Sequence, residues 1–128
     1  PICNVYYANY ILWQGRCREM FLFDHAPGVI DLINQGLALV TVNVSCQYLS
    51  ELFAFDKVII AMQLKEMKQN RITMGFEYWR LKDNEKILVA KGEQQAACMR
   101  RQGGATVPVP IPEELQQALR LYQANSLL

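Results

Sequence analysis

Residues 6–23 constrain the fold most, because they read as one long helix that is apolar on nearly every side. The side chains that recur at helical spacing are Tyr10, Trp13, Cys17 and Phe21. A helix that is apolar all round is normally buried. Yet Arg16, Arg18 and Glu19 lie in its middle, and a buried charge is costly unless it is partnered or used. We therefore expect this segment to be both a core element and a candidate site.

Gly15 lies in the interior of the same helix. Glycine costs roughly 1 kcal/mol relative to alanine at such a position. The residue therefore indicates close packing of the helix against a strand or against a neighbouring chain.

Alternating apolar and polar residues follow the helix and predict strands over residues 39–48, 57–65, 72–79 and 87–99. In the first strand the apolar face runs from Val40 to Tyr48 in strict alternation, as in a half-buried strand. The connections at residues 68–70 and 82–85 are short, and short connections force neighbouring strands to be antiparallel.

Two shorter helices and a stiff tail complete the pattern. Residues 27–36 predict a helix that a proline opens and a glycine ends. Residues 100–104, an arginine pair followed by a glycine pair, read as a solvated loop. The prolines of residues 108–112 predict an extended tail, and residues 112–122 a last amphipathic helix.

One long helix followed by an antiparallel sheet of at least four strands belongs to the α+β class. A sheet with one apolar face must cover that face, and wrapping the sheet round the helix does so. The prediction is therefore a hotdog fold, an antiparallel sheet wrapped around one long central helix. The length of 128 residues fits a single domain over residues 1–128.

Composition argues against several classes of protein. The formal net charge of +1 gives no basic footprint for nucleic acid. The four cysteines form no C-x-x-C pair and His25 is the single histidine, so a metal site is not expected. The cysteines read as reduced core residues, which favours the cytoplasm. No apolar run reaches the roughly 20 residues that span a bilayer, and we expect no membrane association and no signal peptide.

The start of the chain resembles a known family. Hotdog thioesterases of the 4-hydroxybenzoyl-CoA thioesterase type carry Asp-x-x-Gly-His-Val-Asn-Asn-x-x-Tyr, with an arginine about two turns later. The segment Cys3-Asn4-Val5-Tyr6-Tyr7-Ala8-Asn9-Tyr10 aligns with the end of that motif, and Arg18 aligns with the arginine. Residues 4–29 are more similar still to the thioesterases of enediyne antibiotic clusters, through Asn4-Val5-Tyr6-Tyr7, Trp13-Gln14-Gly15-Arg16-Cys17-Arg18-Glu19 and Asp24-His25-Ala26-Pro27-Gly28-Val29.

Two positions depart from the family pattern. Cys3 stands where glycine is usual. The acidic residue of the wider family, which is asparagine in the enediyne group, would lie directly before Pro1, and the first strand of the fold would also precede this sequence. An asparagine or aspartate directly before Pro1 would complete the site that the resemblance implies.

The resemblance implies a hydrolase that frees a polyene β-ketoacyl chain from the acyl carrier protein domain of an iterative polyketide synthase. It implies no cofactor, and a homo-oligomer, a dimer of dimers with sites between subunits. Two alternatives stay open, a general acyl-CoA thioesterase and a non-catalytic hotdog protein that sequesters acyl chains. CoA binding needs basic residues for its phosphates, and the sequence shows no obvious cluster of that kind.

The resemblance singles out four candidate catalytic residues: Asn4, Tyr7, Tyr10 and Arg18. Free backbone amides in the first turn of a helix can form an oxyanion site, and the family points to that of Tyr7. Asn4 either orients the water or the thioester, or caps the helix. Tyr10 either hydrogen-bonds the carbonyl or the departing acid, or packs in the core with its hydroxyl satisfied.

Arg18 also has two interpretations. An arginine on an apolar helix usually pairs with a carboxylate, and Glu19, Glu51 and Glu77 are available. The family instead implies that Arg18 holds the β-keto or carboxylate oxygens of the product. The resemblance favours the second interpretation.

Overall fold

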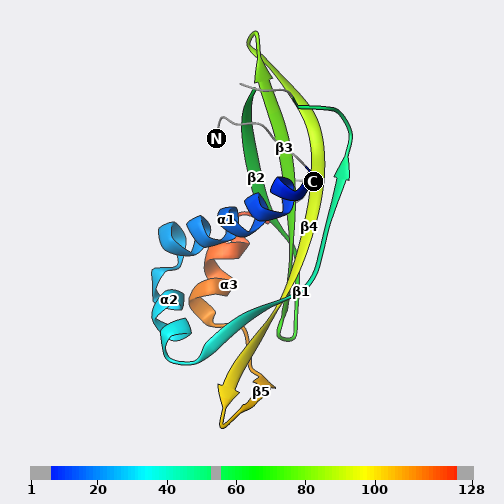
Figure 1. Cartoon of the computed structure of the whole chain (residues 1–128). Helices are drawn as coiled ribbons and strands as arrows, with labels where there is room; N and C mark the ends of the chain where they lie inside the picture. The colour runs from blue at the N-terminus through cyan, green and yellow to red at the C-terminus, as the bar shows by residue number, and fades with distance from the viewer. Residues whose placement is uncertain (1–6, 53–55, 124–128) are drawn as a thin grey trace.

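The computed structural model describes residues 7–52 and 56–123 and has the expected α+β hotdog architecture (Figure 1). In chain order the elements are α1 (Tyr7–His25), α2 (Pro27–Asn34), β1 (Leu37–Tyr48), β2 (Lys57–Lys68), β3 (Arg71–Lys82), β4 (Glu85–Gln102), β5 (Ala105–Pro108) and α3 (Glu113–Arg120). The strands form one antiparallel sheet in the order β1-β4-β3-β2, and β5 pairs with β4. Among the helices described, none is long and apolar enough to cross a membrane.

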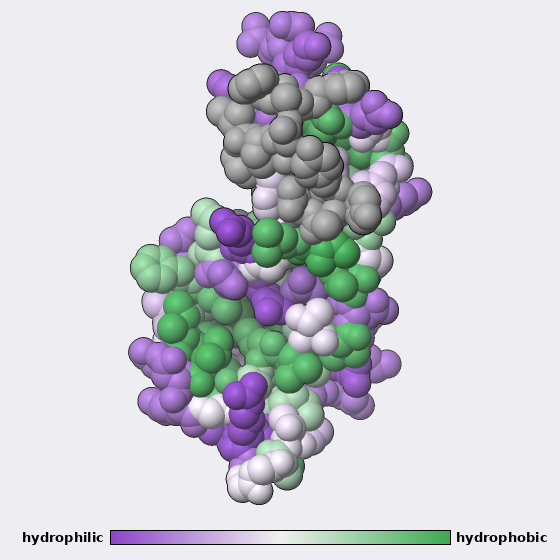
Figure 2. Space-filling model, viewed as in Figure 1, coloured by the Kyte–Doolittle hydropathy of each residue, from purple (hydrophilic) through white to green (hydrophobic). Residues whose placement is uncertain are grey.

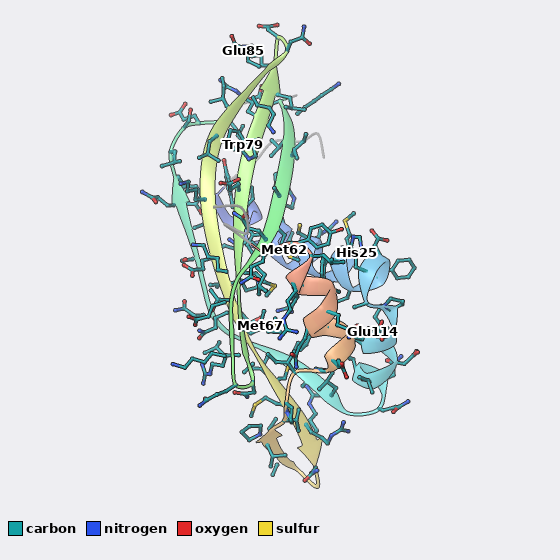
Figure 3. All side chains as sticks on the ribbon, turned by 180° about the vertical axis from the view of Figure 1, so that it is seen from behind. His25, Met62, Met67, Trp79, Glu85 and Glu114 are labelled. Carbon is teal, nitrogen blue, oxygen red and sulfur yellow. The ribbon has the colours of Figure 1, made fainter. Side chains whose placement is uncertain are left out.

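The core lies between the helices and one face of the sheet. Tyr10, Trp13 and Phe21 of α1 are buried in the same cluster as Phe76 and Tyr78 of β3. Burying a side chain of this size contributes roughly 1.5–3 kcal/mol. Helix α3 covers the sheet next to α1, on the side toward which Met62 and Met67 of β2 lie (Figure 3). The helices and the sheet therefore share one core, and α1 runs across it.

Two tight turns set the register of β3 against β4 and of β4 against β5. Asp83 and Asn84 join β3 to β4 with φ values of 52° and 64°, and Gly103 and Gly104 join β4 to β5 with φ values of 53° and 84°. Such left-handed pairs are typical of two-residue hairpins. The prediction of a solvated loop over residues 100–104 is therefore wrong. Residues 100–102 continue β4, because the glycine pair turns the chain back onto it as β5.

Strand β1 keeps only part of its predicted alternation. Its register against β4 shifts between Thr41 and Asn43, so Val42 lies in a bulge. Val40 and Val42 are exposed. The prediction of a strictly alternating, half-buried face is therefore wrong for the first half of β1. The strand lies at the edge of the sheet and contains a bulge there.

Helix α1 and strand β1 leave no room for a side chain at Gly92 of β4. A Cβ at Gly92 would overlap with Nε2 of Gln14 and lie 3.1 Å from the carbonyl oxygen of Ser45. A Cβ at Gly15 would meet no atom of the described residues within 4 Å. The first of the two predicted alternatives, a strand of the same chain packed on Gly15, is therefore wrong. Gly92 gives Gln14 the room to reach β1, where its Nε2 donates to the carbonyl oxygen of Ser45 at 2.9 Å.

Replacing Gly92 by alanine is expected to lower the free energy of unfolding by roughly 2 kcal/mol, within the range for overpacked cores. Gln14 is buried and the Ser45 carbonyl belongs to the backbone, so neither can easily move away. Gly75→Ala is the matched control, because the three atoms nearest to a Cβ there are carbons of the exposed Lys65 side chain, at 3.1–3.4 Å. Urea unfolding compares the two variants, and equal losses would contradict the expectation.

A side chain from α3 caps the N-terminus of α2. The N-cap residue Ala26 makes no side-chain hydrogen bond, and Oε2 of Glu114 instead accepts a hydrogen bond from the backbone amide of Gly28 at 2.9 Å (Figure 3). The carboxylate also lies at the positive end of the α2 dipole. This hydrogen bond links α3 to the start of α2, next to the end of α1.

Replacing Glu114 by alanine is expected to cost about 1 kcal/mol of stability, as for the loss of other helix caps. Glu113 lies in the same first turn of α3, and its Oε1 accepts a hydrogen bond from Nε2 of Gln117 within α3 at 3.3 Å. Glu113→Ala therefore removes the interaction with the α3 dipole and the exposed hydrogen bond with Gln117, but it leaves the cap on α2 intact, so it should cost less. The difference between the two variants in thermal unfolding isolates the cap, and no difference would show that the cap contributes nothing.

Candidate functional site

Tyr10, Gln14 and Arg18 form a polar line along the face of α1 that meets the sheet. They are spaced four residues apart, so their side chains share one helix face. At about 1.5 Å of rise per residue, Tyr10 and Arg18 lie about 12 Å apart along the helix axis. The structure therefore brings these residues onto one face but not into mutual contact, and a site that uses them all is elongated.

Arg18 is held by uncharged acceptors from two strands. Its Nη1 donates to Oε1 of Gln94 in β4 at 2.8 Å and to Oγ1 of Thr41 in β1 at 3.3 Å. Burial lowers the pKa of Arg18, and the Glu19 carboxylate raises it in part. An arginine nevertheless keeps its charge in proteins, so the guanidinium remains a cation.

No carboxylate of the described residues lies within ion-pair distance of Arg18. The alternative in which Glu19, Glu51 or Glu77 forms an ion pair with it is therefore wrong. Sequence reasoning missed Gln94 and Thr41, because neither residue type is distinctive and both come from strands whose register only the fold sets. Gln94 is itself buried, so it holds the guanidinium from the core side.

A cavity of about 490 Å³ opens beside Arg18, between α1, α2 and the first half of β1. Two cations line it, Arg18 and Arg101, together with Glu19. The other lining side chains are mainly aliphatic, and they include Leu22, Ile33, Leu37, Leu39 and Val40. On the face with α1 in front, hydrophobic side chains gather over α1, α2 and the start of β1 (Figure 2). The cavity thus combines an apolar wall with positive charge.

Tyr10 is a buried residue of the aromatic core. Its ring centroid lies 4.9 Å from those of both Tyr48 and Tyr78, and its backbone carbonyl accepts a hydrogen bond from the Tyr78 hydroxyl. Burial, followed by the nearby Cys46 and Tyr48, raises the pKa of Tyr10 to about 12. The Tyr10 hydroxyl therefore stays protonated at neutral pH, where it can donate a hydrogen bond but cannot act as a base.

Gln14 carries an unused hydrogen-bond acceptor. The side chain is fully buried, and its Oε1 has no partner among the described residues. Buried polar atoms without a partner are uncommon in folded proteins. Sequence reasoning missed Gln14, and the available signal was its position midway between Tyr10 and Arg18 on one helix face.

The N-terminus of α1 supplies the remaining candidate groups. The helix begins at Tyr7, so the amides of its first turn have no acceptor within the helix. Asn4 lies outside the described residues, as does the Tyr7 side chain. The oxyanion role of the Tyr7 amide therefore stays a prediction. Tyr7 and Arg18 lie about 16 Å apart along α1 at the usual rise per residue.

Comparison with known proteins shows the family to which this chain is similar. Residues 1–119 match the thioesterase-like superfamily. A relative from Aquifex aeolicus (strain VF5), provisionally named an esterase, is 30% identical over 116 residues, which cover 91% of this chain and 84% of the relative. The family resemblance of the sequence is confirmed.

Solved structures agree with this match. Crystal structures of the dynemicin thioesterase, which concern polyene binding, include a chain that is 46% identical with a TM-score of 0.90, covering 97% of this chain and 88% of that one. A mutant 4-hydroxybenzoyl CoA thioesterase in complex with 4-hydroxybenzoyl CoA has a TM-score of 0.79 at 14% identity, covering 91% of this chain and 86% of that one. The second similarity shows the shared fold.

Proposed function

Because this chain belongs to the thioesterase-like superfamily and is a thioester hydrolase, we propose that its substrate is a long polyene β-ketoacyl thioester. In this proposal the acyl carrier protein domain of an iterative, enediyne-type polyketide synthase presents the substrate in the cytoplasm, and no cofactor is needed. The 46% identity with the dynemicin thioesterase supports this substrate class. The motif residues between 4 and 29 support it independently.

The observation that carries the proposal is the setting of Arg18. Gln94 and Thr41 hold the guanidinium in place without neutralising it. Its charge is therefore available to an oxygen of a ligand, and charge-assisted hydrogen bonds to such oxygens are strong. The apolar wall of the adjoining cavity suits a conjugated hydrocarbon chain. An acyl chain with an oxygen near its reactive end matches both features.

The proposed site is shared between two subunits. In a β-ketoacyl thioester the two oxygens lie only two carbons apart, so the amide of Tyr7 and Arg18 of one chain, about 16 Å apart along α1, cannot hold both. The cavity beside Arg18 is lined by residues 37–40 of β1, at the edge of the sheet. Pairing of two subunits along β1 would bring a second subunit to this cavity. We assign the thioester carbonyl to the amides of one subunit and the β-keto oxygen to Arg18 of the other.

The chemistry follows from these assignments. A water oxygen, oriented by Asn4, bonds to the thioester carbon, and the amides at Tyr7 and Ala8 stabilise the oxyanion that forms. The carbon–sulfur bond then breaks, the thiol of the carrier leaves with a proton, and the β-keto acid is released. Tyr10 donates a hydrogen bond from its protonated hydroxyl to the carbonyl or the departing acid. Arg18 holds the β-keto oxygen throughout.

Single-turnover hydrolysis tests the substrate class. A polyene β-ketoacyl chain is compared with a saturated chain of the same length, each on a carrier protein and on CoA. We expect the carrier-bound β-ketoacyl chain to react fastest. Equal rates on CoA would favour a general acyl-CoA thioesterase, and tight binding without hydrolysis would favour an acyl-sequestering protein. Either result would contradict the proposal.

Mixing two variants of low activity tests the shared site. Subunits that carry Tyr7→Pro, which removes the amide donor, are refolded or exchanged with subunits that carry Arg18→Ala. In a mixed pair one site loses both groups and the other keeps both. Activity should therefore recover to roughly a quarter of the parent when half of the pairs are mixed. No recovery, in mixtures shown to exchange subunits, would place both groups in one subunit.

A further inference from the structure

A second arginine lines the cavity beside Arg18. Arg101, near the end of β4, borders the same space of about 490 Å³. Its backbone amide donates to the carbonyl oxygen of Gly36 at 3.1 Å, which holds the end of β4 against the start of β1. Its guanidinium, in contrast, is exposed and forms no hydrogen bond or ion pair with any described residue. The backbone of Arg101 is therefore fixed at the cavity, while its charge is not engaged.

The charges around this cavity favour one anion. Among the described residues that line it, the charged side chains are those of Arg18, Arg101 and Glu19, so positive charge is in excess by one. An acyl thioester is neutral and does not compensate that charge. The free acid that hydrolysis forms is an anion at neutral pH. Opposite charges attract more strongly in a partly desolvated cavity than in water, so the cavity suits the acid better than the thioester.

We propose that Arg101 binds the carboxylate of the released acid, while the hydrocarbon chain lies against the aliphatic wall of the cavity. The inference rests on the proposed function, because that reaction forms the acid. In a β-keto acid a single methylene separates the carboxylate from the keto group, so an acid whose keto oxygen is held by Arg18 keeps its carboxylate within the same cavity. Guanidinium and carboxylate match in charge and in planar geometry, and their hydrogen bonds are often bidentate.

This assignment gives the two arginines different tasks. Arg18 holds the keto oxygen during hydrolysis, whereas Arg101 acts after the carbon–sulfur bond has broken. The new carboxylate then turns from the oxyanion amides towards Arg101. The same contact retains the acid in the cavity, so the free acid competes with the next thioester. Arg101 therefore makes the enzyme sensitive to the concentration of its own product.

A matched pair of probes tests the site. Dodecanoate and dodecanamide share one hydrocarbon chain, but only dodecanoate is charged at neutral pH. Calorimetric titration of the full chain gives both dissociation constants, and their ratio isolates the contribution of charge. The parent should prefer dodecanoate. Arg101→Gln should reduce that preference roughly fivefold, the upper end of the range for an exposed ion pair. Arg101→Lys retains a positive charge and should recover part of the preference.

Two further variants check the direction of the effect. Glu19→Gln removes the carboxylate that lines the cavity, so it should increase the preference for dodecanoate roughly twofold. Arg100→Gln is the matched control for the loss of a positive charge. The guanidinium of Arg100 donates to the carbonyl oxygen of Gln35 at 3.4 Å, and Arg100 is not among the residues that line the cavity. Its replacement should leave the preference unchanged.

These titrations need no hydrolysis, so they separate this proposal from the proposed function. A parent that does not prefer dodecanoate would overturn the carboxylate site, and so would equal ratios for the parent and Arg101→Gln. An equal loss for Arg100→Gln and Arg101→Gln would also overturn it, because general surface charge would then explain the preference. A chain that hydrolyses no β-ketoacyl thioester would contradict the proposed function, while a preference that depends on Arg101 would still support the carboxylate site.

Discussion

Replacing Tyr7 by proline is expected to lower kcat for thioester hydrolysis roughly 100- to 1,000-fold, the loss typical of one oxyanion donor. Tyr7 is the first residue of α1. Proline is well tolerated at that position, because the first amide has no acceptor within the helix and the ring favours the helical φ. The substitution therefore removes one N–H donor while α1 remains in place.

Tyr7→Ala is the matched control, because it removes the same side chain but keeps the amide. It should retain most of the activity of the parent in single-turnover hydrolysis of a long β-ketoacyl thioester. Circular dichroism and thermal unfolding would establish that both variants fold. Equal rates for the proline and alanine variants would show that the Tyr7 amide is not the oxyanion donor.

Replacing Gln94 by glutamate is expected to lower kcat/KM roughly 10- to 100-fold, as much as Arg18→Ala, because a hydrogen bond to a charged group contributes about 1.5–3 kcal/mol. Oε1 of Gln94 lies 2.8 Å from Nη1 of Arg18. A carboxylate at that position would form a buried ion pair and occupy the charge that the ligand oxygen needs. Both variants should also lose the preference for a β-ketoacyl over a saturated chain.

Two neutral variants separate the charge of Arg18 from its placement. Gln94→Met removes the closer acceptor, and Thr41→Val removes the acceptor at 3.3 Å. Both leave the charge free, so each should cost less activity than Gln94→Glu. Steady-state kinetics on matched β-ketoacyl and saturated thioesters provides the ranking. Parent-like kinetics for Gln94→Glu would exclude a role for the free charge of Arg18.

The candidate site was predictable from the sequence only in part. Arg18 stood out because an arginine on an apolar helix is unusual and fits the spacing of a family. The partners of Arg18 were not predictable, because Gln94 and Thr41 reach it from β4 and β1, which are distant in the sequence. Judged by charge alone, the glutamates were better candidates for pairing with Arg18. Gln14 was missed for a related reason, since a glutamine on a helix has no chemical signature until its burial is known. Asn4 lies outside the described residues.

The elements were predictable where local patterns decide them. The long helix, the four long strands and the short helices all follow from periodicity and from prolines and glycines. Tertiary contacts decided the rest. Gly15 and Gly92 look alike in sequence, but only Gly92 faces a buried side chain. The bulge at Val42 and the pairing of β5 with β4 depend on how far the partner strand extends.

Strand β1 cannot form its pairing in the sheet until β4 has been synthesised. In the described sheet its hydrogen-bonded partner is β4, with Leu37 opposite Arg100 and Tyr48 opposite Ala90, while β2 and β3 lie between them in the chain. On the ribosome, the first of these strands to emerge therefore stays unpaired until nearly the whole sheet has been synthesised. Such distant pairing slows folding, and an unpaired apolar strand promotes aggregation of the nascent chain. Folding during translation can finish only after β4 has left the exit tunnel.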